Sequence, residues 1–191
     1  MRLDGMAPYN IFHWSLTREE AWIDTHLANF HSVFVGDAAW MNARLGQRSG
    51  GRITHVACHS HARGELVAAE KNHPREADKA LAFYKRLDAV EAPCKLLPAL
   101  ERLAFRRRES LPIWDRFREW INSDAMRGIL PKSRLGKAVT YINNHWEALR
   151  RYLNDGRLPI DNNRSEQTIR LFVLEGGTGP SWDIRKRPRN A

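Results

Sequence analysis

Four polar side chains near the C-terminal end of the sequence have the types and spacing of a metal site. Asp161 is followed by Asn162 and Asn163, and Glu166 comes three residues after the second asparagine. Asp and Asn favour helix starts because their short side chains satisfy free backbone N–H groups. We therefore predict a helix that carries Glu166 in its first turn. Oxygen donors gathered at such a position can hold a divalent cation.

The same spacing has a purely structural interpretation. Asn163 and Glu166 match a capping box, in which the glutamate side chain reaches back to the backbone N–H of the cap residue. Asp161 is typical of an Asx turn. Taken alone, the spacing favours this interpretation over a metal site.

Another carboxylate follows a predicted strand in the N-terminal third of the chain. Residues 32–36 are largely apolar, and Asp37 comes directly after them. Ligands of open α/β sheets gather at the carboxyl ends of the strands, where an aspartate is held rigidly. The alternative is that Asp37 only forms a turn, and without further signals that interpretation is favoured.

Cys58, His61 and Arg63 follow another predicted strand, at residues 52–57. A cysteine and a histidine three residues apart suggest zinc, but structural zinc sites use four ligands, commonly in two close pairs. Cys94 and the other histidines lack the spacing of a second pair. We therefore predict that this segment packs a strand against a helix and does not bind zinc.

The elements that must position these residues are those of a helix-rich α/β protein. Residues 9–14 are predicted to form a strand, and a helix is expected from Thr17 to about Phe30. Residues 76–153 are expected to be mostly helical, with a Ser133 cap before a long apolar stripe. Four prolines are expected to mark breaks or first turns between these helices. They are Pro93, Pro98, Pro112 and Pro131.

Positive charge indicates a polyanionic partner. The chain has 31 Lys and Arg residues against 22 Asp and Glu, which gives a net charge of +9. Such an excess favours nucleic acid. Lys137, Asn144 and Arg151 are seven residues apart, which predicts one polar helix face for phosphate contacts. Other basic residues of the helical region are expected to add to this surface: Arg102, Arg106, Arg107, Arg108, Lys132, Arg134 and Arg150.

The sequence indicates neither a membrane nor a disulfide-rich protein. No apolar run approaches the roughly 18 residues of a membrane span, and the N-terminus lacks the apolar segment of a signal peptide. Two cysteines do not make a disulfide framework. A reducing cytoplasm is therefore the expected location.

The Asp-Asn-Asn-x-x-Glu stretch, followed by a helix that contains Arg170, resembles the C-terminal signature of insertion sequence 66 transposases. Residues 33–45 are similar to the family's segment around its second catalytic aspartate. Cys58, His61 and Arg63 match the family's Cys-Trp-Ala-His-x-Arg-Arg motif. The family also has a helical insertion where residues 76–153 lie.

This resemblance implies an RNase H-like fold and a DDE mechanism, in which three carboxylates hold Mg²⁺ or Mn²⁺ and DNA ends are cut and joined. Asp37 would be the second catalytic carboxylate and Glu166 the third, with Asp161 a weaker candidate ligand. The expected partners are transposon-end DNA and other transposase subunits, in a bacterial nucleoid. The expected DNA contacts are Asn162, Asn163, Arg170, Lys137 and Arg151.

The chain departs from the family pattern within two of these segments. The family usually has tyrosine two positions after the aspartate, whereas Asp37 is followed by Ala38, Ala39 and Trp40, so the register there is open by one residue. His59 stands in place of the motif's tryptophan, and Gly64 in place of its second arginine.

The ends of the chain also depart from the family. Residues 175–191 are rich in Gly, Pro and like charges, which predicts a disordered or frame-shifted tail. The strand with the family's first catalytic aspartate would lie upstream of residue 9, and nothing places Asp4 on it. We therefore expect residues 1–174 to be a partial RNase H-like catalytic domain that is inactive, or nearly so, as a single chain.

Two alternatives follow from the same residues. The chain could be a non-enzymatic basic DNA-binding protein, a transposase remnant; dependence on metal would separate this from the enzyme. It could also fail to fold, because missing sheet strands leave unpaired edges and half a core. A cooperative thermal transition would argue against that.

Overall fold

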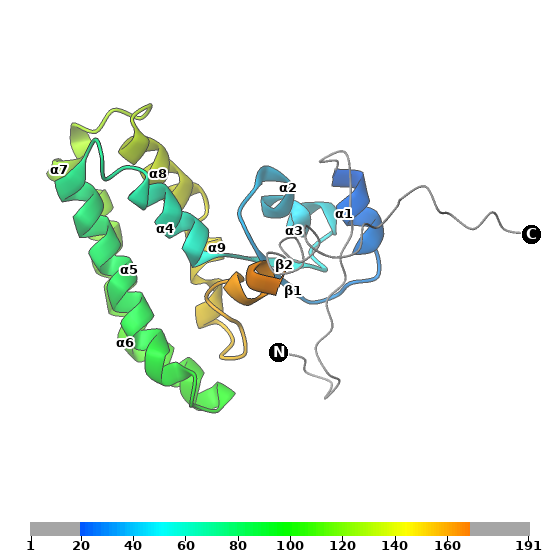
Figure 1. The fold of residues 1–191 in the computed structure, drawn as a ribbon. Coiled ribbons are helices and arrows are strands. Elements are labelled where there is room, and N and C mark those ends of the chain that lie inside the picture. The colour runs from blue at the N-terminus through cyan, green and yellow to red at the C-terminus, as the bar shows by residue number, and fades with distance from the viewer. Residues whose placement is uncertain (1–19, 169–191) are drawn as a thin grey trace, which may run out of the picture. The chain divides into compact units, whose positions relative to one another are not determined.

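The computed structural model describes residues 20–168 of the chain, and its elements are shown in Figure 1. Packing divides the chain into two units, Thr17–Asn162 and a second made of Met1–Leu16 with Asn163–Ala191. Of the second unit, the structure describes only a helix at residues 163–168. The predicted strand at 9–14, the start of the first helix and the tail at 175–191 lie outside the described residues.

Two short parallel strands, β1 (Val33–Gly36) and β2 (Thr54–Ala57), form the sheet of the described residues. Both lie within the predicted stretches and begin one or two residues later than expected. Their register pairs Val33 with Thr54 and Gly36 with Ala57. Because parallel strands need a crossover connection, the chain returns through α2 (Trp40–Ala43) and α3 (Leu45–Arg48).

The first described helix, α1 (Glu20–His26), ends earlier than the predicted Phe30. Arg52 explains part of this difference, because its guanidinium binds the backbone carbonyls just beyond the helix. Its Nη1 donates to the carbonyl of Ala28 at 2.6 Å and to that of Phe30 at 3.2 Å. These carbonyls are therefore satisfied without a further helical turn.

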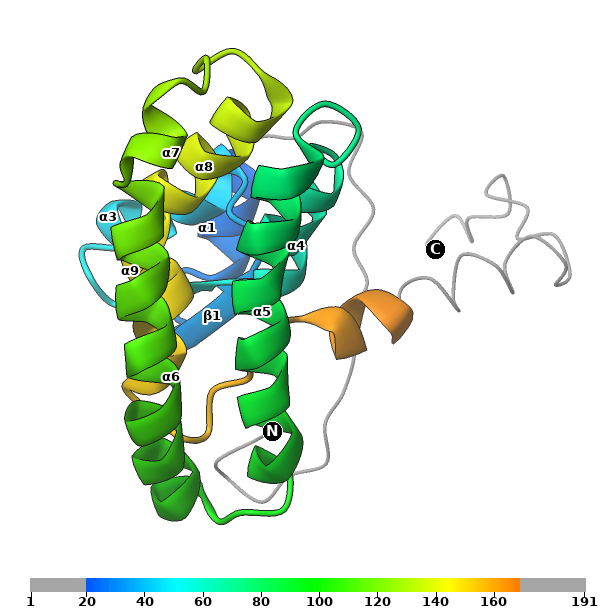
Figure 2. The ribbon, with the colours of Figure 1, turned by 90° about the vertical axis from the view of Figure 1, so that its left-hand side faces the viewer.

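Every element between residues 74 and 153 is helical, as the sequence predicted. The two longest helices, α5 and α6, run side by side, and α4 packs against both α5 and α8 (Figures 1 and 2). No helix of the described residues is long and apolar enough to cross a membrane. The bounds are α4 His59–Val67, α5 Pro74–Cys94, α6 Ala99–Ile121, α7 Asp124–Arg127, α8 Arg134–Asn144, α9 Trp146–Arg150 and the 3-10 helix η1 Arg151–Leu153.

The predicted helix signals in this region are right in part. Ser133 caps α8, since its Oγ accepts a hydrogen bond from the Gly136 N–H at 3.0 Å, and Pro98 directly precedes α6. The prediction for Pro112 is wrong, because it lies inside α6. That helix continues past it with Trp114 and Phe117 fully buried, and this packing offsets the roughly 3 kcal/mol that an internal proline costs.

The apolar stripe after Ser133 does not form one helix. The chain leaves helical geometry at His145, where φ is −111° and ψ is 15°, and this residue separates α8 from α9. The stripe residues nevertheless face the core on both sides of the break. Leu135, Ile142, Trp146, Leu149 and Leu153 are all buried.

An aromatic cluster from α4, α5, α6, α9 and η1 fills the centre of the helical part. Phe83 and Phe117 stack with ring centroids 4.8 Å apart, and Trp114 meets Trp146 edge to face at 4.9 Å. Such pairs add to the stabilisation from apolar burial. The core continues to β2 through Val56 and Ala57, so helices and strands share one hydrophobic cluster.

Candidate functional site

The carboxyl ends of β1 and β2 meet at one edge of the sheet, where Asp37 lies. The Cys58 N–H donates to the Gly36 carbonyl at 2.8 Å, so pairing continues to the last residue of β1. Asp37 follows as a half-buried side chain, and Ala38 after it is buried. This is the position that the sequence predicted for Asp37, at the sheet edge where α/β proteins bind ligands.

Two contacts fix Asp37. The Asn42 side-chain amide, on α2, donates a short hydrogen bond to Asp37 Oδ1. The ring Nε2 of His55, on β2, lies 3.0 Å from the Asp37 backbone carbonyl. A carbonyl can only accept, so this nitrogen carries the proton. Burial lowers the pKa of His55 below its ordinary value, which keeps the ring neutral at pH 7.

Tyr141 on α8 faces the same edge. Its pKa is raised to about 12, first by burial and then by the negative charge of Asp37, against a hydrogen bond with the Ala38 backbone. Tyr141 therefore stays protonated and offers a hydroxyl beside the aspartate. No sequence signal singled out Tyr141 or Asn42, because both depend on how α8 and α2 pack.

Residues 158–162 run past the start of α4, directly after β2. The His59 N–H donates to the Ile160 carbonyl at 3.1 Å, which brings Asp161 and Asn162 to this part of the molecule. The negative charge of Asp161 contributes, after burial, to raising the pKa of Asp88, and Arg63 opposes it. Asp161, Asp88 and Arg63 are therefore electrostatic neighbours.

Asn162 lies immediately before the helix that begins at residue 163. Its Oδ1 is buried and accepts no hydrogen bond among the described residues. A buried acceptor without a partner is costly and marks a position where a donor or an ion would fit. Asn162 is thus one of the predicted site residues whose side chain has an unused oxygen.

Asn163 and Glu166 belong to the second unit. The helix at 163–168 begins as the sequence predicted, with Glu166 half-buried in it. Thr168 Oγ1 donates to the Arg164 carbonyl at 3.0 Å within this helix. Arg170, a predicted DNA contact, lies outside the described residues.

The residues of the Cys-x-x-His-x-Arg motif differ in burial. Cys58 is fully buried at the start of α4, His61 is half-buried, and Arg63 is exposed. A fourth residue of this segment, His59, was noted in the sequence only as a replacement for the motif's tryptophan. His59 is buried, and its Nε2 lies 2.8 Å from the Leu149 carbonyl.

An aromatic box surrounds the His59 ring. Tyr84, Trp114 and Tyr152 meet it edge to face, with centroids 5.7, 5.5 and 5.1 Å away. Burial lowers the pKa of His59 from 6.5 to about 4, so the ring is neutral at pH 7. His59 stands where the resembling family has tryptophan, and in this chain it fills the aromatic core.

Two predicted features of the basic surface are wrong. Lys137 is exposed on α8, but Arg151 lies in η1 beyond the break at His145, so the two do not share a helix face. Arg151 Nη1 donates to the His55 carbonyl at 2.6 Å. Arg106 is not a surface charge, because it is 2% exposed and paired with Glu91. Counting charges along the sequence does not separate such internal arginines from free ones.

Carboxylate and amide oxygens are the right donor types for Mg²⁺. Asp37 and Asp161 lie in one unit, and Glu166 lies in the other. Within residues 20–168, no three His, Cys, Asp or Glu side chains are grouped so as to hold a metal ion. The described part of the chain thus presents separate donors of a suitable type.

Similarity to known proteins extends over most of the chain. A family model described as "Transposase IS66 family" matches residues 2–176. Uncharacterized proteins y4hP and y4jD of Sinorhizobium fredii are similar to it. The first is 28% identical over 87% of this chain and 33% of its own length. The second is 25% identical over 86% of this chain and 32% of its own.

A third Sinorhizobium fredii protein, the uncharacterized y4qI, is 28% identical over 82% of this chain and 32% of its own length. The chain therefore spans about a third of the length of the curated relatives that it matches. No solved structure matches it.

Proposed function

Because the chain belongs to the IS66 family of transposases, we propose that it takes part in DNA transposition through divalent-metal-dependent strand cleavage and transfer. Asp37 and Glu166 are the proposed catalytic carboxylates of an RNase H-like site, with Asp161 as a further ligand. We propose transposon-end DNA as the substrate and other transposase subunits as partners. These are proposals because the relatives are about three times longer than this chain.

The observation that carries the proposal is the placement of Asp37. It follows β1 at the carboxyl edge of a parallel strand pair, and Asn42 orients its carboxylate. An anchored carboxylate at this edge suits a ligand for a hard cation. When bound, Mg²⁺ or Mn²⁺ would activate the attacking oxygen and stabilise charge on the leaving oxygen.

The other residues have positioning roles in this proposal. His55 holds the backbone at Asp37 through its ring nitrogen, and the protonated Tyr141 hydroxyl lies beside the carboxylate. Asn162 offers a buried oxygen without a partner among the described residues. Asn162 and Asn163 would orient the start of the Glu166 helix or contact phosphate, and Arg170, Lys137 and Arg151 would contact DNA.

Calorimetric titration with Mn²⁺ or Mg²⁺ tests the proposal. We expect the wild-type chain to bind metal, and both Asp37→Asn and Glu166→Gln to weaken binding by roughly tenfold or more. Asp115→Asn, an exposed aspartate on α6, is the matched control and should bind as the wild type does. Binding lost in only one of the two site variants would refute a shared site.

Strand cleavage is a separate measurement. The residues proposed here supply two of the family's three catalytic carboxylates, so we expect little nicking of plasmid DNA by this chain with Mn²⁺. Robust nicking that Glu166→Gln abolishes would show that the chain holds a complete site. A wild-type chain that binds DNA but no metal would instead be a non-enzymatic basic DNA-binding protein.

A further inference from the structure

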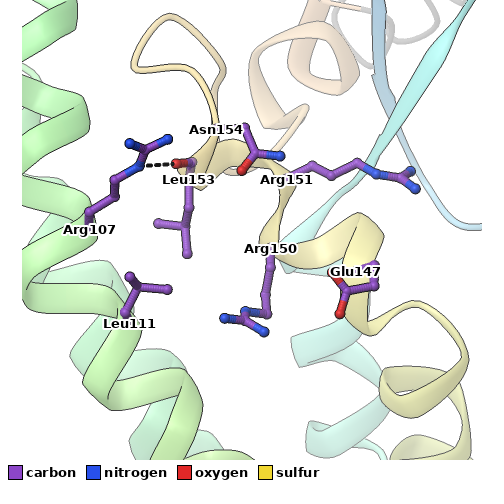
Figure 3. A pocket seen from close by; sticks show the side chains of 7 residues that line it. All are labelled: Arg107, Leu111, Glu147, Arg150, Arg151, Leu153 and Asn154. Carbon is purple, nitrogen blue, oxygen red and sulfur yellow. Dashed lines mark hydrogen bonds between the residues drawn. The ribbon is translucent and has the colours of Figure 1, made fainter.

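Two adjoining hollows lie where α6 faces the α8–α9–η1 segment, and they share Glu147 and Arg151. The first hollow has a volume of about 220 Å³ and is shown in Figure 3. The second has a volume of about 340 Å³. All of the residues that line them belong to the unit Thr17–Asn162.

Three of the seven residues that line the first hollow are arginines, Arg107, Arg150 and Arg151. Arg107 lies on one side and Arg150 on the other, and Asn154 lies beside Leu153 (Figure 3). Arg107 Nε already has a hydrogen-bond acceptor, because it donates to the Leu153 carbonyl at 3.0 Å. Arg150 Nε is buried and has no hydrogen-bond acceptor among the described residues. A buried charged donor in this state favours an anionic oxygen as its partner.

The second hollow continues this character past Arg151, whose guanidinium extends away from Arg107 and Arg150 toward the strands (Figure 3). Arg118 lies 3.8 Å from the ring centroid of Trp146 and donates from Nη1 to Asn143 Oδ1 at 2.8 Å. The stacking and the hydrogen bond hold the guanidinium in place. A guanidinium has several N–H groups, so others can donate to a ligand.

Positive charge in both hollows comes from arginine. Burial lowers the pKa of His55 and of His145, which both line the second hollow, so these rings are neutral at pH 7. Arginine stays charged, and its planar fork matches the oxygens of a phosphate group. Among the residues that line the two hollows, Glu147 is the acidic one, and its side chain is exposed.

We propose that the two hollows form one site for the phosphodiester backbone of DNA, in which Arg150 and Arg118 contact phosphates and Glu147 weakens binding by repulsion. The choice of DNA as the ligand rests on the proposed function. The site itself rests on the four arginines around two adjoining hollows. It differs from the predicted face of Lys137, Asn144 and Arg151, because Lys137 lines neither hollow, although Asn144 and Arg151 do line the second.

The test measures the anisotropy of a fluorescent 20-base-pair DNA at several salt concentrations, in EDTA. EDTA removes metal, so DNA binding by the hollows is measured independently of Asp37 and Glu166. The proposed DNA site and the proposed metal site can therefore be refuted one without the other. We expect Arg150→Gln and Arg118→Gln each to weaken binding roughly fivefold and to reduce the salt slope by about 1. Glu147→Gln should strengthen binding by a similar factor, since it removes a negative charge.

Two controls keep a folding defect apart from a lost contact. Arg116→Gln removes an exposed arginine from α6 that lines neither hollow, and it should change affinity less than twofold. Arg150→Lys keeps the charge and should retain most of the binding, because a lysine binds phosphate as a point charge. Thermal unfolding of each variant shows whether it folds.

Three outcomes would overturn the proposal. One is equal loss of binding in Arg116→Gln and Arg150→Gln, which would indicate general charge attraction. Another is a Glu147→Gln variant that binds no more tightly than the wild type. The third is competition by millimolar inorganic phosphate, or by a mononucleotide, that is as strong per phosphate group as competition by unlabelled DNA. That result would indicate a small-anion pocket.

Discussion

The guanidinium of Arg106 donates two hydrogen bonds to the Glu91 carboxylate, at 2.7 Å and 2.6 Å. It ties α6 to α5 across 15 residues of sequence. The third arm of Arg106, Nη1, donates to the Leu158 carbonyl at 2.8 Å. One buried cation thus joins the helix pair to the segment that leads to Asp161 and Asn162. The position of these candidate residues depends on an ion pair within the helical part.

Removing one partner of this ion pair should destabilise the protein strongly. Arg106→Met leaves Glu91 partly buried without its cation, and breaking a buried pair costs roughly 3–5 kcal/mol. Arg108→Gln is the matched control, because its pair with Glu109 is exposed and contributes at most about 1 kcal/mol. Urea unfolding measures both. Equal free energies of unfolding for the two variants would contradict a structural role for the Arg106 pair.

The Arg106 pair also shows what the sequence can and cannot predict. A count of Lys and Arg predicts a basic protein. It also assigns Arg106 to a DNA-binding surface, which is wrong, because a count cannot tell which arginines tertiary packing will bury. The position of Asp37 was predictable, since an apolar strand followed by a polar residue is a local pattern. Its partner Asn42 was not, because α2 reaches Asp37 only through the turn between them.

The helical region follows the same division. Apolar periodicity predicted which residues of the stripe after Ser133 are buried, including Ile142 and Trp146. It did not predict the break at His145, because the stripe stays in phase on both sides and no Gly or Pro marks the site. Propensity also failed at Pro112, where core packing outweighs the local cost.

Gly156 allows a close approach of two backbone segments, and we expect Gly156→Ala to destabilise the protein. A Cβ there would lie 1.9 Å from the Ala99 carbonyl oxygen and 3.0 Å from the Leu103 backbone nitrogen. Neither atom can rotate aside, so the start of α6 or the loop at 156 must shift, at a cost of roughly 1–3 kcal/mol.

Gly64→Ala is the matched control for Gly156→Ala. A Cβ at this position on α4 meets no atom within 4 Å, so alanine should stabilise the helix by about 0.5–1 kcal/mol. Thermal melts followed by circular dichroism compare the two variants. A Gly156→Ala melting temperature at or above that of the wild type would show that the two backbones are not held together here.

Stability should fall with acid because of His59. Its pKa is about 4 in the folded protein and 6.5 when unfolded. Between these values the unfolded state binds more protons, so the stabilisation is complete above pH 6.5 and is lost as the pH falls toward 4. The loss should reach about 3 kcal/mol.

His59→Gln removes this titration, and its free energy of unfolding should vary less with pH than that of the wild type. His55, whose pKa is also lowered, and Asp88, whose pKa is raised by burial, contribute equally to both proteins and cancel in the comparison. Urea unfolding at pH 7 and pH 4.5 gives the two slopes. Parallel slopes in variant and wild type would mean that His59 is protonated in the folded state.

Asn42 should set metal affinity at Asp37 without binding metal itself. Its amide donates to Asp37 Oδ1 and holds the carboxylate in one orientation at the end of β1. Loss of a side chain that orients a metal ligand typically weakens affinity by roughly 10–100-fold. Asn42→Ala should therefore bind Mn²⁺ at least about tenfold more weakly by calorimetry, with a milder effect than Asp37→Asn.

Asn72→Ala serves as the control for Asn42→Ala, since Asn72 is exposed in the turn before α5 and should leave Mn²⁺ affinity unchanged. A change in the Asn42 variant that appears only in the enthalpy, at constant affinity, would mean that Asp37 finds its orientation without the amide. Full retention of binding by Asn42→Ala, together with its loss in Asp37→Asn, would assign the orienting contact to the His55 side of the strand edge instead.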